Sequence, residues 1–304
     1  MGKLAFVFSG QGAQFPGMGT ELAAASPAAA AIFAMADRIR PGTSAQCASA
    51  TKEELSTTVN TQPCLFCADL MAAEALREAG VVPDCLAGFS LGEIPALAFG
   101  GYLSYEDAFR FVVKRGEYMD LCAKEAPGAM YAVVKLTNEQ VEAICHGVEG
   151  AYPVNYNCKG QVVAACREEV GEALVAAVKA EKGKAIKLAV SGAFHSPMMD
   201  GASRRLAEEF AGLTFESPRY PVYANATAAP YTGKELLFKQ VNSPVLWQKT
   251  IEEMAAAGVD TFVEVGAGKT LCGLVAKICP EATALSVQDV ESLQNTLEVL
   301  KDVR

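Results

Sequence analysis

The order of elements expected between residues 129 and 190 is the feature that most limits what this chain can fold into. Apolar and polar runs there predict a strand at 130–134, a helix at 138–146, strands at 154–157 and 162–165, a helix at 168–182 and a strand at 185–190. This β-α-β-β-α-β order is that of a ferredoxin-like unit. We therefore expect a small subdomain with this fold.

The segments before and after this unit alternate between strand and helix, which is typical of an α/β fold. They predict a strand at 4–8, a glycine-rich loop at 10–19, a helix at 21–40, a helix at 61–79 with Pro63 in its first turn, and strands near 222–224 and 261–265. We expect residues 1–128 and 191–304 to form one large subdomain, into which residues 129–190 are inserted.

Composition excludes several classes of protein. The net charge of −9 argues against a nucleic-acid partner, because phosphate binding requires a basic face. No apolar run is long enough for a membrane span, and the N-terminus lacks the pattern of a secretory signal. A cytoplasmic protein is expected, so its ten cysteines are interpreted as reduced, and the isolated Cys64-x-x-Cys67 predicts no metal site.

Gly88-Phe89-Ser90-Leu91-Gly92 is a GxSxG motif between a short apolar strand and a helical run that reaches Phe99. A nucleophile elbow requires this context, because small flanking residues permit the tight turn that exposes the serine hydroxyl at a helix N-terminus. The alternative is a glycine-rich turn with a capping serine. The flanking strand and helix favour Ser90 as a nucleophile.

A serine nucleophile needs a general base, and the chain has only two histidines. His146 ends a predicted surface helix, whereas His195 lies in a loop of small residues just after the inserted unit. A histidine in a loop at a subdomain junction is better placed to act as a base. We therefore predict that His195 is the base, rather than a structural residue.

The loop Gly10-Gln11-Gly12 places one backbone N–H group between two glycines, where the chain can approach a substrate closely. With the N–H group of Leu91, the residue after the nucleophile, the N–H group of Gln11 is a candidate for an oxyanion hole. An ordinary turn is the alternative for this loop.

Taken together, these motifs resemble the malonyl-CoA:acyl carrier protein transacylases of fatty acid and polyketide synthesis, nearly from end to end. The segments that carry the resemblance are Phe8 to Gln14, Gly88 to Glu93, Lys114 to Gly116, Asn155 to Asn157, Gly160 to Val163, Ala193 to Met198 and Ser243 to Trp247. Such a set in the same order is far more specific than any one motif.

The resemblance implies a role for further residues. Arg115 is expected to bind the free carboxylate of a malonyl group, and the main-chain carbonyl of Gln240 to orient His195. Asn157 is expected near the site, and Phe194 stands where relatives that accept only malonyl have an aromatic residue. Three positions depart from the family pattern: Ser9, Phe89 and Ser243.

We therefore expect an α/β-hydrolase-like large subdomain with an inserted ferredoxin-like subdomain, and an active site in the cleft between them. The predicted activity is transfer of malonyl from coenzyme A to the phosphopantetheine thiol of an acyl carrier protein through an ester on Ser90, without metal or cofactor. The alternatives are a serine hydrolase or thioesterase with the same elbow, and a catalytically inactive docking module.

An acidic carrier protein is the expected partner of a monomeric chain, and Lys184 and Lys187 are the residues expected to dock it. Three properties stay open at this point: the choice between fatty acid and polyketide synthesis, the particular carrier, and the effect of Phe89 on acyl preference.

Overall fold

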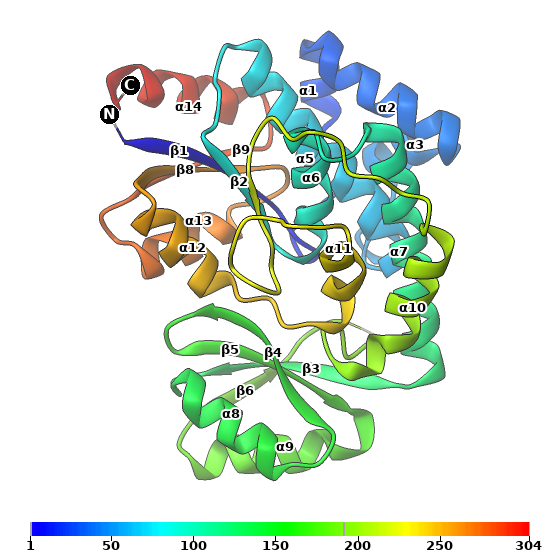
Figure 1. The fold of residues 1–304 in the computed structure, drawn as a ribbon, viewed down its shortest axis with the longest axis vertical. Coiled ribbons are helices and arrows are strands. Elements are labelled where there is room, and N and C mark those ends of the chain that lie inside the picture. Colours follow the sequence, from blue (N-terminus) through cyan, green and yellow to red (C-terminus); the bar gives the residue numbers. More distant parts are fainter. Residues whose placement is uncertain (1, 191, 304) are drawn as a thin grey trace.

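The computed structural model describes residues 2–190 and 192–303, so the expected subdomain boundary at Ser191 and the two chain ends at Met1 and Arg304 lie outside the described residues. The described residues form one parallel sheet and one antiparallel sheet (Figure 1), which confirms the predicted fold class. Strands near both ends of the chain belong to the parallel sheet, and the antiparallel sheet comes from the middle.

The parallel sheet has five strands in the order β7-β2-β1-β8-β9 among the described residues. Their bounds are β1 Lys3–Phe8, β2 Cys85–Gly88, β7 Val222–Tyr223, β8 Val259–Val265 and β9 Thr283–Val287. Every neighbouring pair is parallel. The carboxyl ends of β2, β1 and β8 therefore lie side by side at one edge of the sheet, and the loops that follow them meet there.

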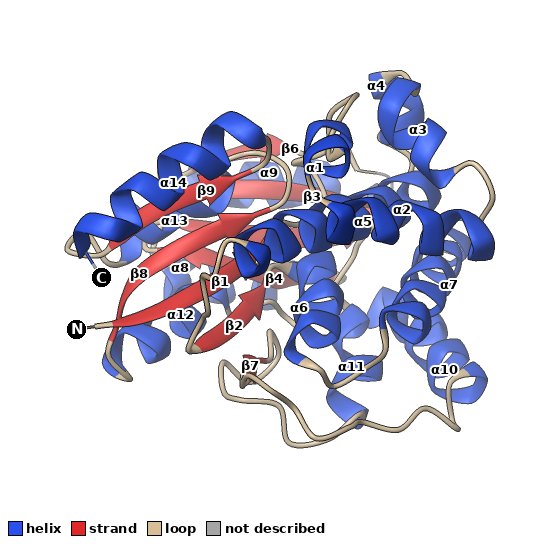
Figure 2. Ribbon diagram, turned by 90° about the horizontal axis from the view of Figure 1, so that it is seen from above, coloured by secondary structure: helices blue, strands red, loops and turns tan. Residues whose placement is uncertain are grey.

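Side chains of β1 alternate between two apolar cores, as expected of a sheet that is buried on both faces. Leu4, Phe6 and Phe8 enter the larger core, with α5 (Thr58–Glu78), α6 (Glu93–Gly100) and α14 (Val290–Val303). Ala5 and Val7 enter the second core, with α12 (Trp247–Ala256) and α13 (Thr270–Ile278). Figure 2 shows the sheet between these two sets of helices.

The other helices of the large part extend the larger core away from the sheet. They are α1 Thr20–Ala25, α2 Pro27–Ile39, α3 Thr43–Ser49, α4 Lys52–Leu55, α7 Tyr105–Glu125, α10 Asp200–Glu209 and α11 Glu235–Lys239. The helix predicted at 21–40 is two helices, because the Ser26 side chain caps α2 and Pro27 begins it. Placing Pro63 in a first turn was wrong, since α5 begins at Thr58.

The antiparallel sheet has the order β4-β5-β3-β6 and carries two helices on one face. The bounds are β3 Gly128–Val134, α8 Asn138–Gly147, β4 Ala151–Cys158, β5 Gln161–Arg167, α9 Gly171–Ala180 and β6 Lys184–Lys187. This confirms the ferredoxin-like element order, although the last strand ends at Lys187 rather than at residue 190. Side chains between this sheet and its helices form a separate apolar core.

Backbone hydrogen bonds join the small sheet to the large part of the molecule. The N–H of Tyr156 donates to the carbonyl of Val245 at 2.9 Å, and the N–H of Val245 donates to the carbonyl of Val154 at 2.8 Å. The face of the small sheet that has no helices is thereby held toward the loops after β1 and β2. No helix among the described residues is both long and apolar enough to cross a lipid bilayer.

Candidate active site

Ser90 stands at the sharp turn where β2 ends and a short 3-10 helix, Ser90–Gly92, begins. Its φ of 53° is in the left-handed region, which side chains rarely occupy and which is typical of a nucleophile elbow. Gly92 permits this turn, because a Cβ atom there would lie 2.3 Å from the carbonyl oxygen of Phe8. The structure therefore has the strand, turn and helix that the GxSxG motif predicts.

The side chain of Asn225 braces the elbow from the loop after β7. Its Oδ1 accepts a hydrogen bond from the Ser90 N–H at 2.8 Å, and its Nδ2 donates to the carbonyl of Gly88 at 2.6 Å. The Asn225 N–H in turn donates to the buried carboxylate of Glu93. Because Asn225 holds both sides of the turn, it limits how Ser90 can move.

His195 contacts the predicted nucleophile directly, since its Nε2 lies 2.7 Å from Ser90 Oγ. Its Nδ1 lies 3.0 Å from the carbonyl of Gln240 and 3.2 Å from that of Ser243. Carbonyls only accept hydrogen bonds, so Nδ1 carries the proton and Nε2 is left free to accept one. The expected Gln240 carbonyl thus lies at the imidazole, and that of Ser243 is a second acceptor that sequence reasoning missed.

Burial and a neighbouring charge keep this imidazole neutral. His195 is 3% exposed, and burial, with a further effect of the Arg115 charge, lowers its pKa from 6.5 to about 4. A neutral imidazole with a free Nε2 is the form that accepts a proton from a hydroxyl. His146, by contrast, is exposed near the end of α8.

Arg115 reaches the same point from α7 and is 1% exposed. Its Nη2 lies 3.3 Å from Ser90 Oγ and donates to Gln240 Oε1 at 2.8 Å, and its Nη1 donates to Gln62 Oε1 at 2.8 Å. Burial lowers its pKa to about 10, and the Glu93 carboxylate opposes this shift, so Arg115 stays charged at neutral pH. Its hydrogen-bond partners in the described chain include no carboxylate, and its Nε has no partner there. A buried, charged guanidinium with no carboxylate partner can bind an anion beside Ser90.

A cleft of about 240 Å³ lies between the loops of the large part and the small sheet. It is lined by Gln11, Phe89 and Asn157, together with residues of β5 and α13. The N–H of Leu91 lies in the first turn after Ser90, where helical N–H groups have no partner within the helix. Gln11 and Asn157 therefore both line this cleft, whereas Leu91 is buried directly after Ser90 and is not among the described residues that line it.

Phe89 directly precedes Ser90, and Phe194 directly precedes His195, but the two rings have different surroundings. Phe89 lines the cleft and packs edge-on against Trp247, with ring centroids 5.4 Å apart. Phe194 is 5% exposed and belongs to the larger core, and it is not among the described residues that line the cleft. The predicted influence of Phe194 on acyl choice therefore stays a prediction.

Several polar residues of the site carry no motif and were missed from the sequence. Gln62 and the side chain of Gln240 hold Arg115, and Asn225 and Glu93 hold the elbow. Burial raises the pKa of Glu93 to about 7, while hydrogen bonds from Tyr231 and Asn225 oppose that shift. The available signal was Gln62, a polar residue directly before the mainly apolar stretch Pro63 to Ala68.

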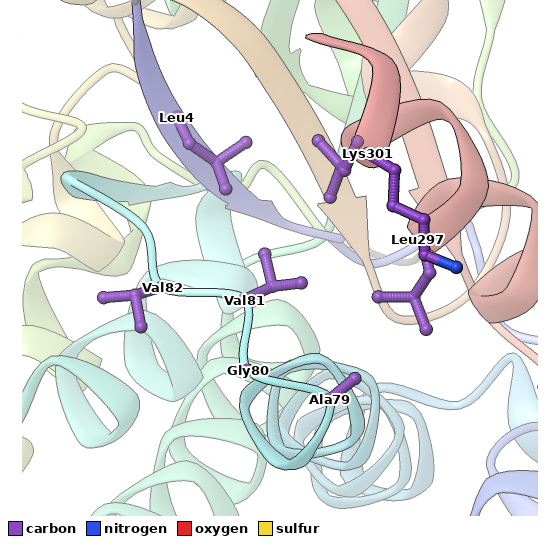
Figure 3. Close-up of a pocket in the computed structure, with 8 residues that line it drawn as sticks. Leu4, Ala79, Gly80, Val81, Val82, Leu297 and Lys301 are labelled. Carbon is purple, nitrogen blue, oxygen red and sulfur yellow. The ribbon is translucent and has the colours of Figure 1, made fainter. Parts of the chain in front are cut away.

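A second hollow, of about 450 Å³, lies at the opposite end of β1 (Figure 3). Its walls are aliphatic side chains such as Leu4, Val81 and Leu297, and Lys301 is the one charged residue among those that line it. It contains no hydroxyl, histidine or acid, so it does not compete with the cleft as a site of acyl chemistry.

The two lysines expected to dock a partner are exposed on β6, at the edge of the small sheet. Side chains alternate between faces along a strand, and Ala185 belongs to the core beneath the helices. Lys187 therefore shares the helix-covered face with Ala185, and Lys184 is on the other face, toward the large subdomain. The lysines flank one edge, but they do not share one face.

Among residues 2–190 and 192–303, no three His, Cys, Asp or Glu side chains are grouped so that they could hold a metal ion. The ten cysteines are free, and eight of them, including Cys64 and Cys67, are buried.

Comparison with known proteins gives one consistent result. Residues 5–294 match the family model described as acyl transferase domain. Malonyl CoA-acyl carrier protein transacylase of Bacillus subtilis is 37% identical over 313 residues, which cover 99% of this chain and 98% of the relative. The crystal structure of the transacylase of that name from Clostridium perfringens superposes with a TM-score of 0.95 at 35% identity, covering 99% of this chain and 98% of that one.

A second solved structure includes a partner. It is a malonyl-transacylase in complex with a type II polyketide synthase acyl carrier protein, with a TM-score of 0.93, 35% identity, and coverage of 97% of this chain and 99% of that one.

Proposed function

Because the chain belongs to the acyl transferase family, we propose that it moves a malonyl group from coenzyme A to the phosphopantetheine thiol of an acyl carrier protein. The main support for this proposal is that the side chains of His195 and Arg115 both contact the hydroxyl of Ser90. Ser90 Oγ lies within hydrogen-bond distance of a neutral His195 and of the buried guanidinium of Arg115. A nucleophile, a base and an anion site in mutual contact match a thioester substrate that carries a carboxylate.

In the first half-reaction, Ser90 Oγ attacks the thioester carbonyl while His195 Nε2 accepts the hydroxyl proton. The backbone N–H groups of Gln11 and Leu91 stabilise the oxyanion of the tetrahedral intermediate. The intermediate then expels the coenzyme A sulfur, which takes the proton from His195, and a malonyl ester remains on Ser90.

In the second half-reaction, the phosphopantetheine thiol of the carrier protein takes the place of coenzyme A. His195 Nε2 accepts the thiol proton, the sulfur attacks the ester carbonyl, and the same oxyanion hole is used. When the intermediate breaks down, Ser90 Oγ leaves and recovers its proton from His195. Neither step requires a metal or a bound cofactor, because these residues supply the nucleophile, the base and the oxyanion donors.

Arg115 is proposed to bind the malonyl carboxylate with its charge-assisted hydrogen bonds. Its contacts with Gln62 and Gln240 support this role, since two neutral amides orient the guanidinium without neutralising its charge.

Asn157 is proposed to contact the thioester arm from the small subdomain, and Phe194 to restrict the acyl group to malonyl. The hydrolase alternative is not favoured, because the full-length relatives are transacylases.

We propose that the carrier protein is acidic and docks beside the cleft at the edge that carries Lys184 and Lys187. Complementary charges mainly increase the rate of such an encounter. A monomeric chain and a cytoplasmic location stay predictions.

Intact mass spectrometry after addition of malonyl-CoA tests this function. The wild-type protein is expected to gain one malonyl group and to lose it to holo carrier protein, while Ser90→Ala gains none. Rapid loss of the adduct as free malonate, without carrier, would identify a hydrolase. An adduct that persists on Ser90→Ala would contradict the assignment of the nucleophile.

A further inference from the structure

A buried hydrogen bond anchors the start of the loop that carries Gln11. Ser9 directly follows β1, and its Oγ donates to Asp69 Oδ1 at 2.7 Å. Ser9 is 1% exposed and Asp69 is fully buried, in the middle of the apolar helix α5. Only Gly10 separates Ser9 from Gln11, so this anchor lies two residues before a proposed oxyanion donor.

The loop that follows β8 closes over the same carboxyl group. Gly266 has a φ of +107°, and a Cβ atom there would lie 1.7 Å from Asp69 Oδ1 and 3.0 Å from Ser9 Oγ. The N–H of Ser9 also donates to the carbonyl of Val265 at 3.3 Å. Asp69 thus lies where the loops after two neighbouring strands meet, out of contact with solvent.

The anchored segment also contacts the nucleophile elbow. The N–H of Phe89 donates to the carbonyl of Phe8 at 3.0 Å, and a Cβ atom on Gly92 would lie 2.5 Å from the Ser9 carbonyl oxygen. A shift of Ser9 would therefore change the position of Gln11 relative to Leu91, whose N–H groups have to converge on one oxygen atom.

We propose that Asp69 is a positioning residue for the oxyanion hole: through Ser9, it sets the position of the Gln11 N–H relative to that of Leu91. This inference rests on the proposed function, because an oxyanion hole has a role only in acyl transfer. Asp69 touches neither substrate nor reacting atoms and acts through the loop alone.

The electrostatic setting indicates that a neutral carboxyl group fills this role. Burial raises the pKa of Asp69 well above its usual value; the nearby Glu264 raises it further, and hydrogen bonds with Ser9 and the Ala267 backbone oppose the shift. A neutral acid still accepts through its carbonyl oxygen. Asparagine offers the same acceptor, shape and charge, so Asp69→Asn should keep the anchor.

The test compares Ser9→Ala and Asp69→Asn, each shown to be folded by its thermal melting profile. Loss of a single oxyanion donor costs about 100- to 1,000-fold in rate, and misplacement by an ångström about 100-fold. Ser9→Ala should therefore lower kcat/KM by about 10- to 100-fold, and by the same factor for malonyl-CoA and for the carrier protein. One hole serves both half-reactions, whereas lost substrate binding would affect only one of them. Asp69→Asn should stay near the wild-type values.

Thr296→Val, on α14, is the matched control, since it removes another buried hydroxyl, which donates to the carbonyl of Ser286 on β9. Unchanged kinetics in a folded Ser9→Ala would overturn the proposal, as would a loss confined to one substrate. An Asp69→Asn variant as slow as Ser9→Ala would overturn the inference that a neutral carboxyl group is sufficient for the anchor. Failure of the proposed function itself would appear differently, as a wild-type protein that never malonylates the carrier.

Discussion

At the scale of single residues, the proposed role of Arg115 is what distinguishes a malonyl enzyme from a general serine acyltransferase. Its guanidinium is buried and held by two neutral amides within reach of Ser90. A buried charge without a counter-charge is costly, and a bound carboxylate offsets that cost. The acyl group that completes this pair is therefore the one the site should select.

Replacement of Arg115 by alanine should shift the preference from malonyl to acetyl. Loss of one partner of a buried ion pair costs about 3 kcal/mol or more, so kcat/KM for malonyl-CoA should fall by about 100- to 1,000-fold. Acetyl-CoA has no carboxylate to pair, so its value should hold or rise. Steady-state kinetics with both substrates measures the ratio.

Arg110→Ala is the matched control for this change, because Arg110 lies on the same helix but is exposed. It should leave both values unchanged. A malonyl-to-acetyl ratio in Arg115→Ala equal to that of the wild type would remove Arg115 from the acyl site.

The pH dependence of acylation should report His195. Its pKa of about 4 means that kcat/KM stays level on the acid side until the pH approaches 4, and then falls because protonation removes the base. The Arg115 charge contributes to this low pKa, so Arg115→Ala should move the acid limb of the profile to higher pH. The limb should stay below pH 6.5, because burial still lowers the pKa of His195. Acetyl-CoA is the substrate to use, because its acyl group does not titrate.

An acid limb at the same pH in both proteins would show that the Arg115 charge does not act on His195. His146→Ala should leave the profile unaltered, since this residue is exposed in the last turn of α8, on the small subdomain.

Sequence alone predicted the residues that belong to a spaced motif or that had few competitors. Ser90 is marked by its flanking glycines, and His195 had one rival. Gln62, Asn225 and Asp69 were not predictable, because a single amide or acid gains its role from contacts between segments far apart in the chain. Ser9, noted as a departure from the family pattern, is the one sequence signal of the anchor with Asp69.

At the scale of elements, the loop after β7 holds the turn after β2, because Asn225 bonds to both Ser90 and Gly88. Asn225→Ala leaves a buried N–H and a buried carbonyl without these partners, which costs about 1–3 kcal/mol for each group. We expect a lower free energy of unfolding and slower formation of the Ser90 adduct, measured by denaturant titration and stopped-time mass spectrometry.

Asn295→Ala, at an exposed position of α14, controls for loss of an asparagine and should match the wild type. If Asn225→Ala loses stability but forms the adduct at the wild-type rate, the hydrogen bonds of Asn225 stabilise the fold without affecting acylation.

Element type was more predictable than element bounds. The strands and helices of the small sheet follow from periodicity, and their order confirmed the ferredoxin-like pattern. The prediction of one helix at 21–40 was wrong at Ser26. The Ser26 side chain caps a second helix, which begins at Pro27. Hydrophobic pattern continues across such a break, so it gives no sign of it.

At the scale of the whole molecule, two parts with separate cores meet around one cleft. The small sheet presents its edge strand β6 beside that cleft, and Lys184 and Lys187 are exposed there. Reversal of both charges should raise the KM for the carrier protein severalfold and leave the KM for malonyl-CoA unchanged. Added salt should reduce the difference.

Reversal of Lys52 and Lys301, two exposed lysines on α4 and α14, changes the net charge by the same amount. It should have no effect on either KM. Equal KM values for the carrier in both double variants would place the docking surface elsewhere.

Ser90 and His195, the proposed nucleophile and base, both have a left-handed backbone, with φ angles of 53° and 61°. This conformation costs a residue with a side chain about 1–2 kcal/mol, and glycine escapes most of that cost. Ser90→Gly should therefore melt at a higher temperature than Ser90→Ala, although neither variant can form the ester. The backbone conformation at position 90 therefore lowers thermal stability when the residue is serine. Selection for thermal stability alone would favour glycine at this position.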